Sequence, residues 1–143
     1  MIKSVFLDAN ILIDIYDSTR SYHEYSYRTV EYLIKNGVDI YTSSDIITTV
    51  YYILKKQFPE VLKYLKKLSI ICNLVGFTNV QLDKAIDLIE QNDKLVDLED
   101  VLQYISAKEI GCDLIISNDI NFPKLEIEIL TSKDFYTNII ENG

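Results

Sequence analysis

The stretch Ser4-Val5-Phe6-Leu7-Asp8 is a short, mainly apolar run that ends in a carboxylate. Such a run, without alternation of polar and apolar residues, is typical of a strand buried on both faces, as in parallel sheets. Open α/β proteins bind their ligands beyond the carboxyl ends of such strands. The stretch therefore predicts the first strand of an α/β fold, with Asp8 in a candidate site.

Short apolar runs recur along the chain and alternate with segments of helical periodicity. We expect four further strands, the last at an edge, at residues 40–42, 70–75, 114–116 and 127–130. We expect helices at residues 11–16, 22–35 and 44–57, after Pro59, from Thr78, from Asp97 to Gly111, and from Ser132. The alternation predicts an α/β fold with a mainly parallel sheet of four to five strands and helices on its faces. No repeat or linker is visible, so residues 1–143 are expected to form a single domain.

The composition excludes several classes of protein. The chain has 143 residues, of which 48% are hydrophobic and 25% charged, close to the globular average. It is therefore not a disordered tail, a collagen-like repeat or a coiled-coil rod. No stretch reaches the roughly 18–20 apolar residues of a membrane helix, and residues 1–8 do not resemble a signal peptide. We expect a cytoplasmic protein that does not enter a membrane.

Histidine and cysteine offer little for catalysis or zinc binding. Cys72 and Cys112 lie inside apolar runs, so we interpret them as reduced core residues rather than a disulfide scaffold or zinc site. The single histidine, His23, lies in a helical stretch rich in Tyr, Glu and Arg, which favours a surface position. Any metal ion must therefore be held by oxygen ligands, which favours Mg²⁺ or Mn²⁺.

Aspartates recur near the predicted strand ends. Asp8 ends the first strand, Asp45 opens the helix after the second, and Asp119 follows the fourth. Asp97 and Asp100 open a helix and are three residues apart, so they can share a face. Like charges repel in a cleft unless a cation joins them. Such a cation can also activate water against a phosphodiester.

Each of these carboxylates also has a purely structural interpretation. Asp45, Asp97 and Asp100 lie in first turns of helices, where acids cap backbone N–H groups; for Asp45 capping is the better interpretation. Asp119 could form an Asx turn in Ser117-Asn118-Asp119. Asp8 is harder to explain this way, because it ends an apolar strand. We therefore favour a role for Asp8 in a site.

Three segments together resemble the PIN-domain family, the VapC-like ribonucleases. They are Phe6 to Asp14 (FLDANILID), Asp97 to Ala107 (DLEDVLQYISA) and Leu114 to Thr131, which contains LIISND, Phe122 and ILT. The segments span nearly the whole chain in the order that the family shows, and the ordered set is more specific than any one motif.

The resemblance implies a three-layer α/β/α sandwich with an acidic cleft that binds Mg²⁺ or Mn²⁺ and cleaves RNA. Asp8, Asp100 and Asp119 correspond to family acids and would be catalytic, and these three would hold the metal together with Asp97. Asn10 and Ser117 match polar residues that accompany the first and last acids. Many relatives are toxins, so the resemblance also implies an antitoxin protein as partner, and a homodimer. Exposed tyrosines on the predicted helices 22–35 and 44–57 are a further hint of a homodimer.

One position departs from the family pattern. The family usually has a glutamate in the helix after the second strand, and alignment of the apolar run places Thr49 there. Asp45 lies one helical turn earlier on the same face and is a candidate substitute. The departure bears on activity more than on fold. It is the main support for an alternative, a catalytically impaired PIN-fold module that binds nucleic acid or protein.

Lysines gather between residues 55 and 67 and are a candidate RNA contact: Lys55, Lys56, Lys63, Lys66 and Lys67. Aromatic residues between them could stack on bases, although a solvated helix face is the simpler interpretation. The net charge of −8 argues against strong nonspecific nucleic-acid binding. A third hypothesis, an aspartate-nucleophile phosphatase, needs a second aspartate two residues after Asp8. Asn10 stands there instead, so this hypothesis ranks low.

Overall fold

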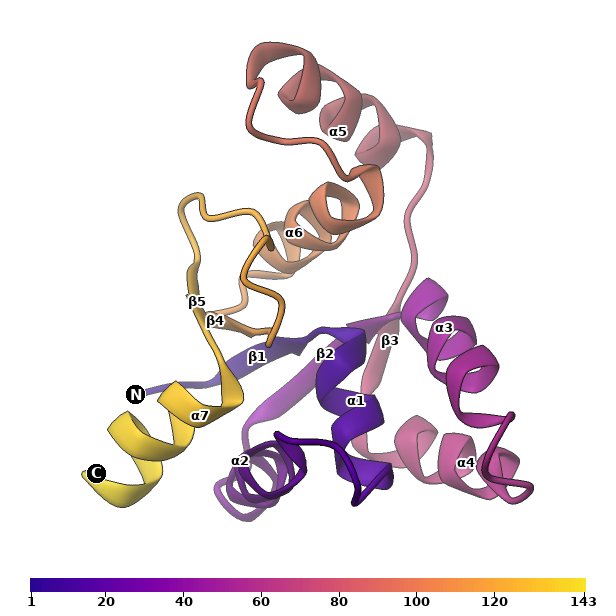
Figure 1. The fold of residues 1–143 in the computed structure, drawn as a ribbon. Coiled ribbons are helices and arrows are strands. Elements are labelled where there is room, and N and C mark those ends of the chain that lie inside the picture. The colour runs from indigo at the N-terminus through magenta and orange to yellow at the C-terminus, as the bar shows by residue number, and fades with distance from the viewer.

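A parallel sheet in the order β3-β2-β1-β4-β5 forms the centre of the computed structural model, which describes all 143 residues (Figure 1). The strands are β1 (Ser4–Leu7), β2 (Asp39–Ser43), β3 (Asn73–Val75), β4 (Leu114–Ile116) and β5 (Glu128–Leu130). All four pairings are parallel, and β1 is central, with Phe6 opposite Tyr41 on one side and Ile115 on the other. The predicted parallel sheet is confirmed, and β5 lies at an edge as expected.

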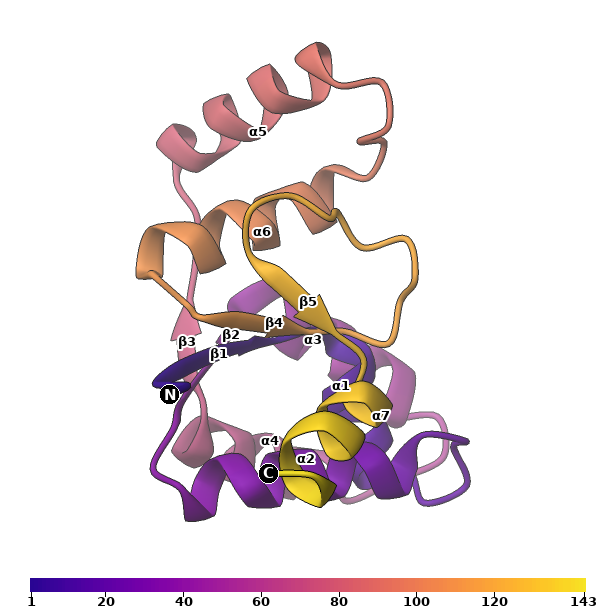
Figure 2. The ribbon, with the colours of Figure 1, turned by 90° about the vertical axis from the view of Figure 1, so that its left-hand side faces the viewer.

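Helices cover both faces of the sheet and make the three layers that Figures 1 and 2 show. One face carries α6 (Leu98–Ile110), and α5 (Asn79–Gln91) packs on α6 from outside. The other layer contains α1 (Ala9–Tyr16), α2 (His23–Lys35), α3 (Ser44–Leu54), α4 (Val61–Ile71) and α7 (Ser132–Phe135), which continues as the π-helical turn η1 (Tyr136–Glu141). The three-layer α/β/α sandwich is therefore confirmed.

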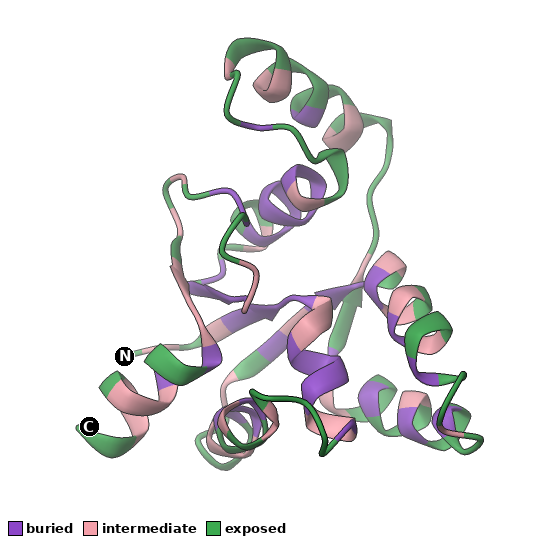
Figure 3. Cartoon of the chain, in the orientation of Figure 1, coloured by how far each residue is buried: buried purple, intermediate pink, exposed green.

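Burial on both faces explains the apolar sequence of β1. Val5, Phe6 and Leu7 have no exposed surface, because α6 covers one face of the sheet and α1 the other (Figure 3). At about 25 cal/mol for each Å² of buried apolar surface, such side chains supply most of the favourable free energy of folding. The next residue, Asp8, is itself buried and is the N-cap of α1. The core therefore fixes the position of Asp8.

Two element ends follow local sequence signals. Thr78 and Gln81 form the predicted capping box at the start of α5. Gly111 ends α6 in the left-handed conformation, with φ of 84°, which a residue with a Cβ atom adopts at a cost. Cys72 and Cys112 are buried free thiols, as predicted.

Several boundaries and faces differ from the prediction. The third strand begins at Asn73 rather than at residue 70, because α4 continues to Ile71 and leaves Ile70 77% exposed. The last helix is capped by Thr131, whose side chain accepts from the Asp134 N–H, and not by Ser132. His23 is half-buried rather than a free surface residue, and its ring contacts the Asp14 carbonyl oxygen. No helix has the length and hydrophobicity needed to cross a membrane.

Candidate active site

Asp8 lies at the carboxyl end of β1, and several donors hold its carboxylate. Its Oδ1 accepts from the Ala9 N–H at 2.7 Å, and its Oδ2 accepts from the Ser117 hydroxyl at 2.6 Å and the Asn10 amide at 3.3 Å. Burial is the largest influence and raises the pKa of Asp8, whereas these hydrogen bonds lower it. The carboxylate is thus fixed in position, although burial disfavours its charge.

Ser117, Asn118 and Asp119 form the turn after β4, beside Asp8. The Ser117 hydroxyl that donates to Asp8 also accepts from the Asp119 N–H at 3.1 Å. The Asn118 N–H donates to the Asn10 side chain at 3.0 Å. Asp119 also forms the predicted Asx-type contact, since its Oδ1 accepts from the Asn121 N–H at 2.9 Å. Asn10 and Ser117 therefore link the ends of β1 and β4.

The first turn of α6 brings further carboxylates to this edge. Asp97 is the N-cap, and its Oδ1 accepts from the Asp100 N–H at 3.0 Å. The Asp100 carboxylate accepts no hydrogen bond. Burial raises its pKa to about 7, and the negative charges of Asp97, Asp8, Asp119 and Glu99 add to this effect. Asp97 therefore caps the helix and also lies within the electrostatic reach of Asp100.

The carboxylates at this edge form an acidic cluster of Asp8, Asp45, Asp97, Glu99, Asp100 and Asp119. The sequence did not indicate Glu99 as one of its members. Burial raises the pKa of Glu99, and the nearby negative charges of Asp45, Asp97 and Asp8 raise it further. Asp45 therefore faces the cluster from the start of α3. Thr49, at the expected position of the family glutamate, uses its hydroxyl to donate to the Asp45 carbonyl oxygen at 3.2 Å. Asp45 and Glu99 thus supply carboxylates near the position where Thr49 stands in place of the family glutamate.

No lysine or arginine side chain pairs with the carboxylates of this site. None of the ion pairs in the structure involves Asp8, Asp45, Asp97, Asp100 or Asp119. The repulsion among these groups is therefore not relieved by lysine or arginine. A cation that binds among such unpaired carboxylates therefore stabilises their charged forms.

The donor atoms fit a hard divalent cation. They are carboxylate, hydroxyl and amide oxygens, which Mg²⁺ and Mn²⁺ prefer, and neither cysteine belongs to the cluster. Two buried oxygens have no hydrogen-bond partner: Ser43 Oγ, directly before α3, and Gln103 Oε1, on α6 three residues after Asp100. No three of the carboxylates, however, are arranged closely enough to form a ready metal-binding group.

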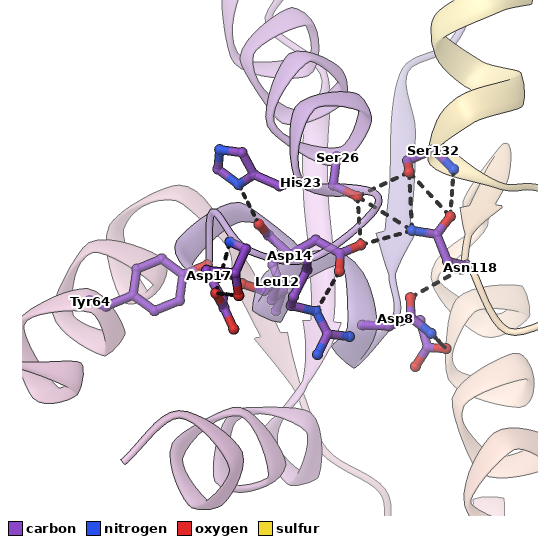
Figure 4. Close-up of polar contacts among 12 residues, drawn as sticks. Asp8, Leu12, Asp14, Asp17, His23, Ser26, Tyr64, Asn118 and Ser132 are labelled. Atoms are coloured by element: carbon purple, nitrogen blue, oxygen red, sulfur yellow. Dashed lines mark hydrogen bonds and ion pairs between the residues drawn. The ribbon is translucent and has the colours of Figure 1, made fainter. Parts of the chain in front are cut away.

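A buried polar network supports the Ser117–Asp119 turn from behind (Figure 4). The Asp14 carboxylate accepts from Arg20 at 2.7 Å, from the Ser26 hydroxyl at 2.9 Å and from the Asn118 amide at 2.9 Å. The Asn118 side-chain oxygen accepts from the Ser132 N–H at 2.8 Å. The network ties α1, α2 and α7 to the turn that carries Asp119. No sequence pattern predicts this network, because its members are up to 118 positions apart.

The lysines proposed from the sequence lie away from the acidic edge. Since α3 starts at that edge and its 11 residues extend about 16 Å, Lys55 and Lys56 lie beyond its far end. The Lys55 ammonium lies 4.6 Å from the centre of the Tyr52 ring, and Lys63 pairs with Glu60 at 3.1 Å. An RNA contact through Lys55, Lys56 and Lys63 stays a prediction.

A three-layer α/β/α fold with carboxylates gathered at the carboxyl ends of its strands defines a class of α/β proteins with an acidic site. The chain belongs to the PIN-domain family: the family model for the PIN domain matches residues 5–128. It is similar to "Ribonuclease VapC1" of Aquifex aeolicus, with 42% identity over 134 residues that cover 93% of each chain. The expected membership of a VapC-like PIN-domain family is thus confirmed.

Solved structures agree on the fold. A toxin–antitoxin complex from Klebsiella pneumoniae superposes with a TM-score of 0.71 at 18% identity, covering 90% of this chain and 97% of that one. VapC20 of Mycobacterium tuberculosis, described as a toxin that cleaves the sarcin–ricin loop, gives 0.67 at 14% identity over 82% and 92%. VapBC2 of Rickettsia felis, bound to promoter DNA, gives 0.67 at 19% identity over 88% and 98%.

Proposed function

We propose that the protein is an endoribonuclease that depends on Mg²⁺ or Mn²⁺ and serves as the toxin of a toxin–antitoxin pair. The observation that carries the proposal is that Asp100, in the first turn of α6, lies near Asp8 and Asp119 at the carboxyl ends of β1 and β4, and that none of the three pairs with a lysine or arginine. The relative named as a ribonuclease, with 42% identity over nearly the whole chain, supports RNA as the substrate.

In this proposal Asp8, Asp97, Asp100 and Asp119 hold the metal ion, and Asp45 and Glu99 complete the acidic surface around it. The metal ion would supply a nucleophile from water at neutral pH and stabilise negative charge on the phosphate. The protein's own part is positional. Ser117 and Asn10 keep the Asp8 carboxylate oriented, and burial keeps bulk water from screening its charge.

The test is cleavage of a mixed single-stranded RNA pool in Mn²⁺, in Mg²⁺ and in chelator. We expect cleavage only with a metal ion, and its loss in Asp8→Asn. Asp39→Asn is the matched control, because Asp39 is an exposed aspartate at the opposite, amino end of the neighbouring strand β2. Cleavage that persists in Asp8→Asn would identify a contaminating nuclease.

A folded protein that neither cleaves RNA nor binds Mn²⁺ would contradict the proposal. It would support the alternative, a PIN-fold binding module without activity, for which Thr49 in place of glutamate is the specific observation. The cleavage assay and Mn²⁺ titration together separate the two functions.

The partner in this proposal is an antitoxin protein. An apolar groove of about 560 Å³ between α1, α2 and α4 offers a surface for it and contains the exposed side chains of Tyr27, Ile34 and Ile70. The solved toxin–antitoxin complexes of the same fold support such a partner. Binding of a candidate antitoxin protein, lost in Ile70→Glu and retained in the similarly exposed Val96→Glu, would test this surface.

A further inference from the structure

A cavity of about 600 Å³ lies directly beside the acidic cluster. Asp97, Asp100 and Asp119 contribute to its lining, and so do residues of two loops, the α5–α6 connection and the β4–β5 loop. Figures 1 and 2 show both loops on the same side of the molecule, next to the start of α6. The acidic site thus opens into a volume within the usual range of small-ligand pockets, about 300–1,000 Å³.

Two lysines, one from each loop, are the only cationic residues that line this cavity. They are Lys94, in the α5–α6 connection, and Lys124, in the β4–β5 loop. Both are exposed, and neither pairs with a carboxylate. By contrast, Lys84 on α5 forms an ion pair with Glu109, and Lys108 on α6 forms one with Glu126.

The backbone under both lysines is anchored. The Lys94 N–H donates to the Asn92 side chain at 3.1 Å, and the next residue, Leu95, is buried. On the other loop Phe122 is buried, and its N–H donates to the Asp119 carbonyl oxygen at 3.1 Å. The two ammonium groups therefore extend from fixed loops, and only their flexible side chains must be ordered when a ligand binds.

We propose that Lys94 and Lys124 contact the RNA phosphates that flank the cleaved one, so that this cavity holds the substrate strand. The proposal rests on the proposed function. A polyanion that approaches a chain of net charge −8, at its most acidic edge, needs cations on its path to that edge. Lys94 and Lys124 are on that path, whereas Lys55, Lys56 and Lys63 are beyond the far end of α3.

The test compares two double variants that change the net charge equally. Lys94→Gln/Lys124→Gln removes the proposed contacts, and Lys56→Gln/Lys66→Gln removes two exposed, unpaired lysines of the α3–α4 region. Binding of a fluorescent single-stranded RNA to each protein, in the Asp8→Asn background with Mn²⁺ present, is measured over a range of salt concentrations. Mn²⁺ affinity and cleavage kinetics are measured in the corresponding proteins that retain Asp8.

Each phosphate contact with single-stranded RNA contributes about 0.7 to the slope of log affinity against log salt concentration. We expect the Lys94/Lys124 double variant to lose about 1.4 from this slope, which is two contacts, and to show a raised KM. Its Mn²⁺ affinity should not fall, because neither lysine holds the metal ion. Lys56 and Lys66 belong to the lysine group that the sequence suggested as an RNA contact, so the same measurement decides between the two groups. If Lys94 and Lys124 hold the RNA, the Lys56/Lys66 variant keeps the parent slope and KM.

An unchanged slope in the Lys94/Lys124 variant, beside RNA binding by the parent protein, would overturn this inference and leave the proposed function intact. A slope lowered only in the Lys56/Lys66 variant would overturn it in favour of the α3–α4 lysines. If the parent protein neither binds nor cleaves RNA, the proposed function fails, and the inference fails with it.

Discussion

Replacement of Asn118 by alanine tests whether the buried network holds the turn that carries Asp119. The Asn118 side chain makes two strong contacts: its amide donates to the Asp14 carboxylate at 2.9 Å, and its oxygen accepts from the Ser132 N–H at 2.8 Å. Asp14 is 3% exposed and Ser132 is fully buried, so water does not readily replace these partners. The substitution therefore leaves a buried carboxylate and a buried N–H group underbonded.

The magnitude follows from these two contacts. A hydrogen bond to a charged group contributes about 1.5–3 kcal/mol, and a buried donor left unsatisfied costs about 1–3 kcal/mol. Together they give about 2.5–6 kcal/mol. Asn118 itself is half-buried, and water can enter part of the vacated space. We therefore expect a loss near the lower end, about 3 kcal/mol in the free energy of unfolding.

Urea denaturation followed by far-UV circular dichroism measures this loss, with tyrosine fluorescence as a second probe because the chain has 11 tyrosines and no tryptophan. Asn138→Ala is the control, since Asn138 is exposed and makes no side-chain hydrogen bond. The variant should also bind Mn²⁺ more weakly, because Ser117 and Asp119 flank the substituted residue. A loss below about 1 kcal/mol, or one equal to that of Asn138→Ala, would refute the reasoning.

Four further predictions concern charge and backbone conformation. Because the pKa of Asp100 is raised to about 7, protons compete with the metal ion, and Mn²⁺ affinity measured by calorimetry should rise with pH through this value; a flat profile would contradict this. Without metal, the free energy of unfolding should fall as the pH rises from 3.8, the ordinary carboxyl pKa, to about 7. The reason is that Asp100 binds its proton more tightly in the folded state than in the unfolded state. Asp8→Asn should raise the free energy of unfolding without metal by about 0.5–2 kcal/mol, because burial disfavours the Asp8 charge and asparagine caps α1 as well; destabilisation in urea would count against this. Gly111→Ala should cost about 1–2 kcal/mol, because φ is 84°, whereas Gly76→Ala, where a Cβ would lie 3.6 Å from the Ser44 hydroxyl, should cost less; equal losses would disprove the argument.

Local chemistry made much of the fold predictable. The apolar residues of β1 identify a strand covered on both faces, and Thr78 with Gln81 marks a helix start through two hydrogen bonds within four residues. Gly111 marks a helix end because only glycine adopts its conformation at little cost. Signals of this kind depend only on neighbouring residues in the sequence, so they can be recognised without knowledge of the tertiary structure.

Ile70 shows where such signals fail. An apolar run of strand-like composition cannot be distinguished by periodicity from the last turn of a helix, and here the helix continues to Ile71. The helix is stabilised by packing of one face of α4, which buries Val61, Tyr64 and Leu68. Ile70 itself is left largely exposed.

The candidate site was predictable in part. Asp8 and Asp119 follow strands, and parallel strands bring their carboxyl ends to one edge of the sheet. Glu99 and Asp14 were not predictable, because each owes its surroundings to residues far along the chain, Asp45 and Asn118 respectively. In the sequence, Glu99 resembles any first-turn helix acid and Asp14 any polar helix residue.

The central place of β1 has a consequence for the protein during its synthesis. Asp8 leaves the ribosome early, but β4, which pairs with β1, and Ser117, which holds the Asp8 carboxylate, are translated more than 100 residues later. A nascent chain that ends before β4 therefore has β1 with one open edge and no assembled acidic cluster. The order of translation thus delays assembly of this site until residues 114–119 have emerged and folded.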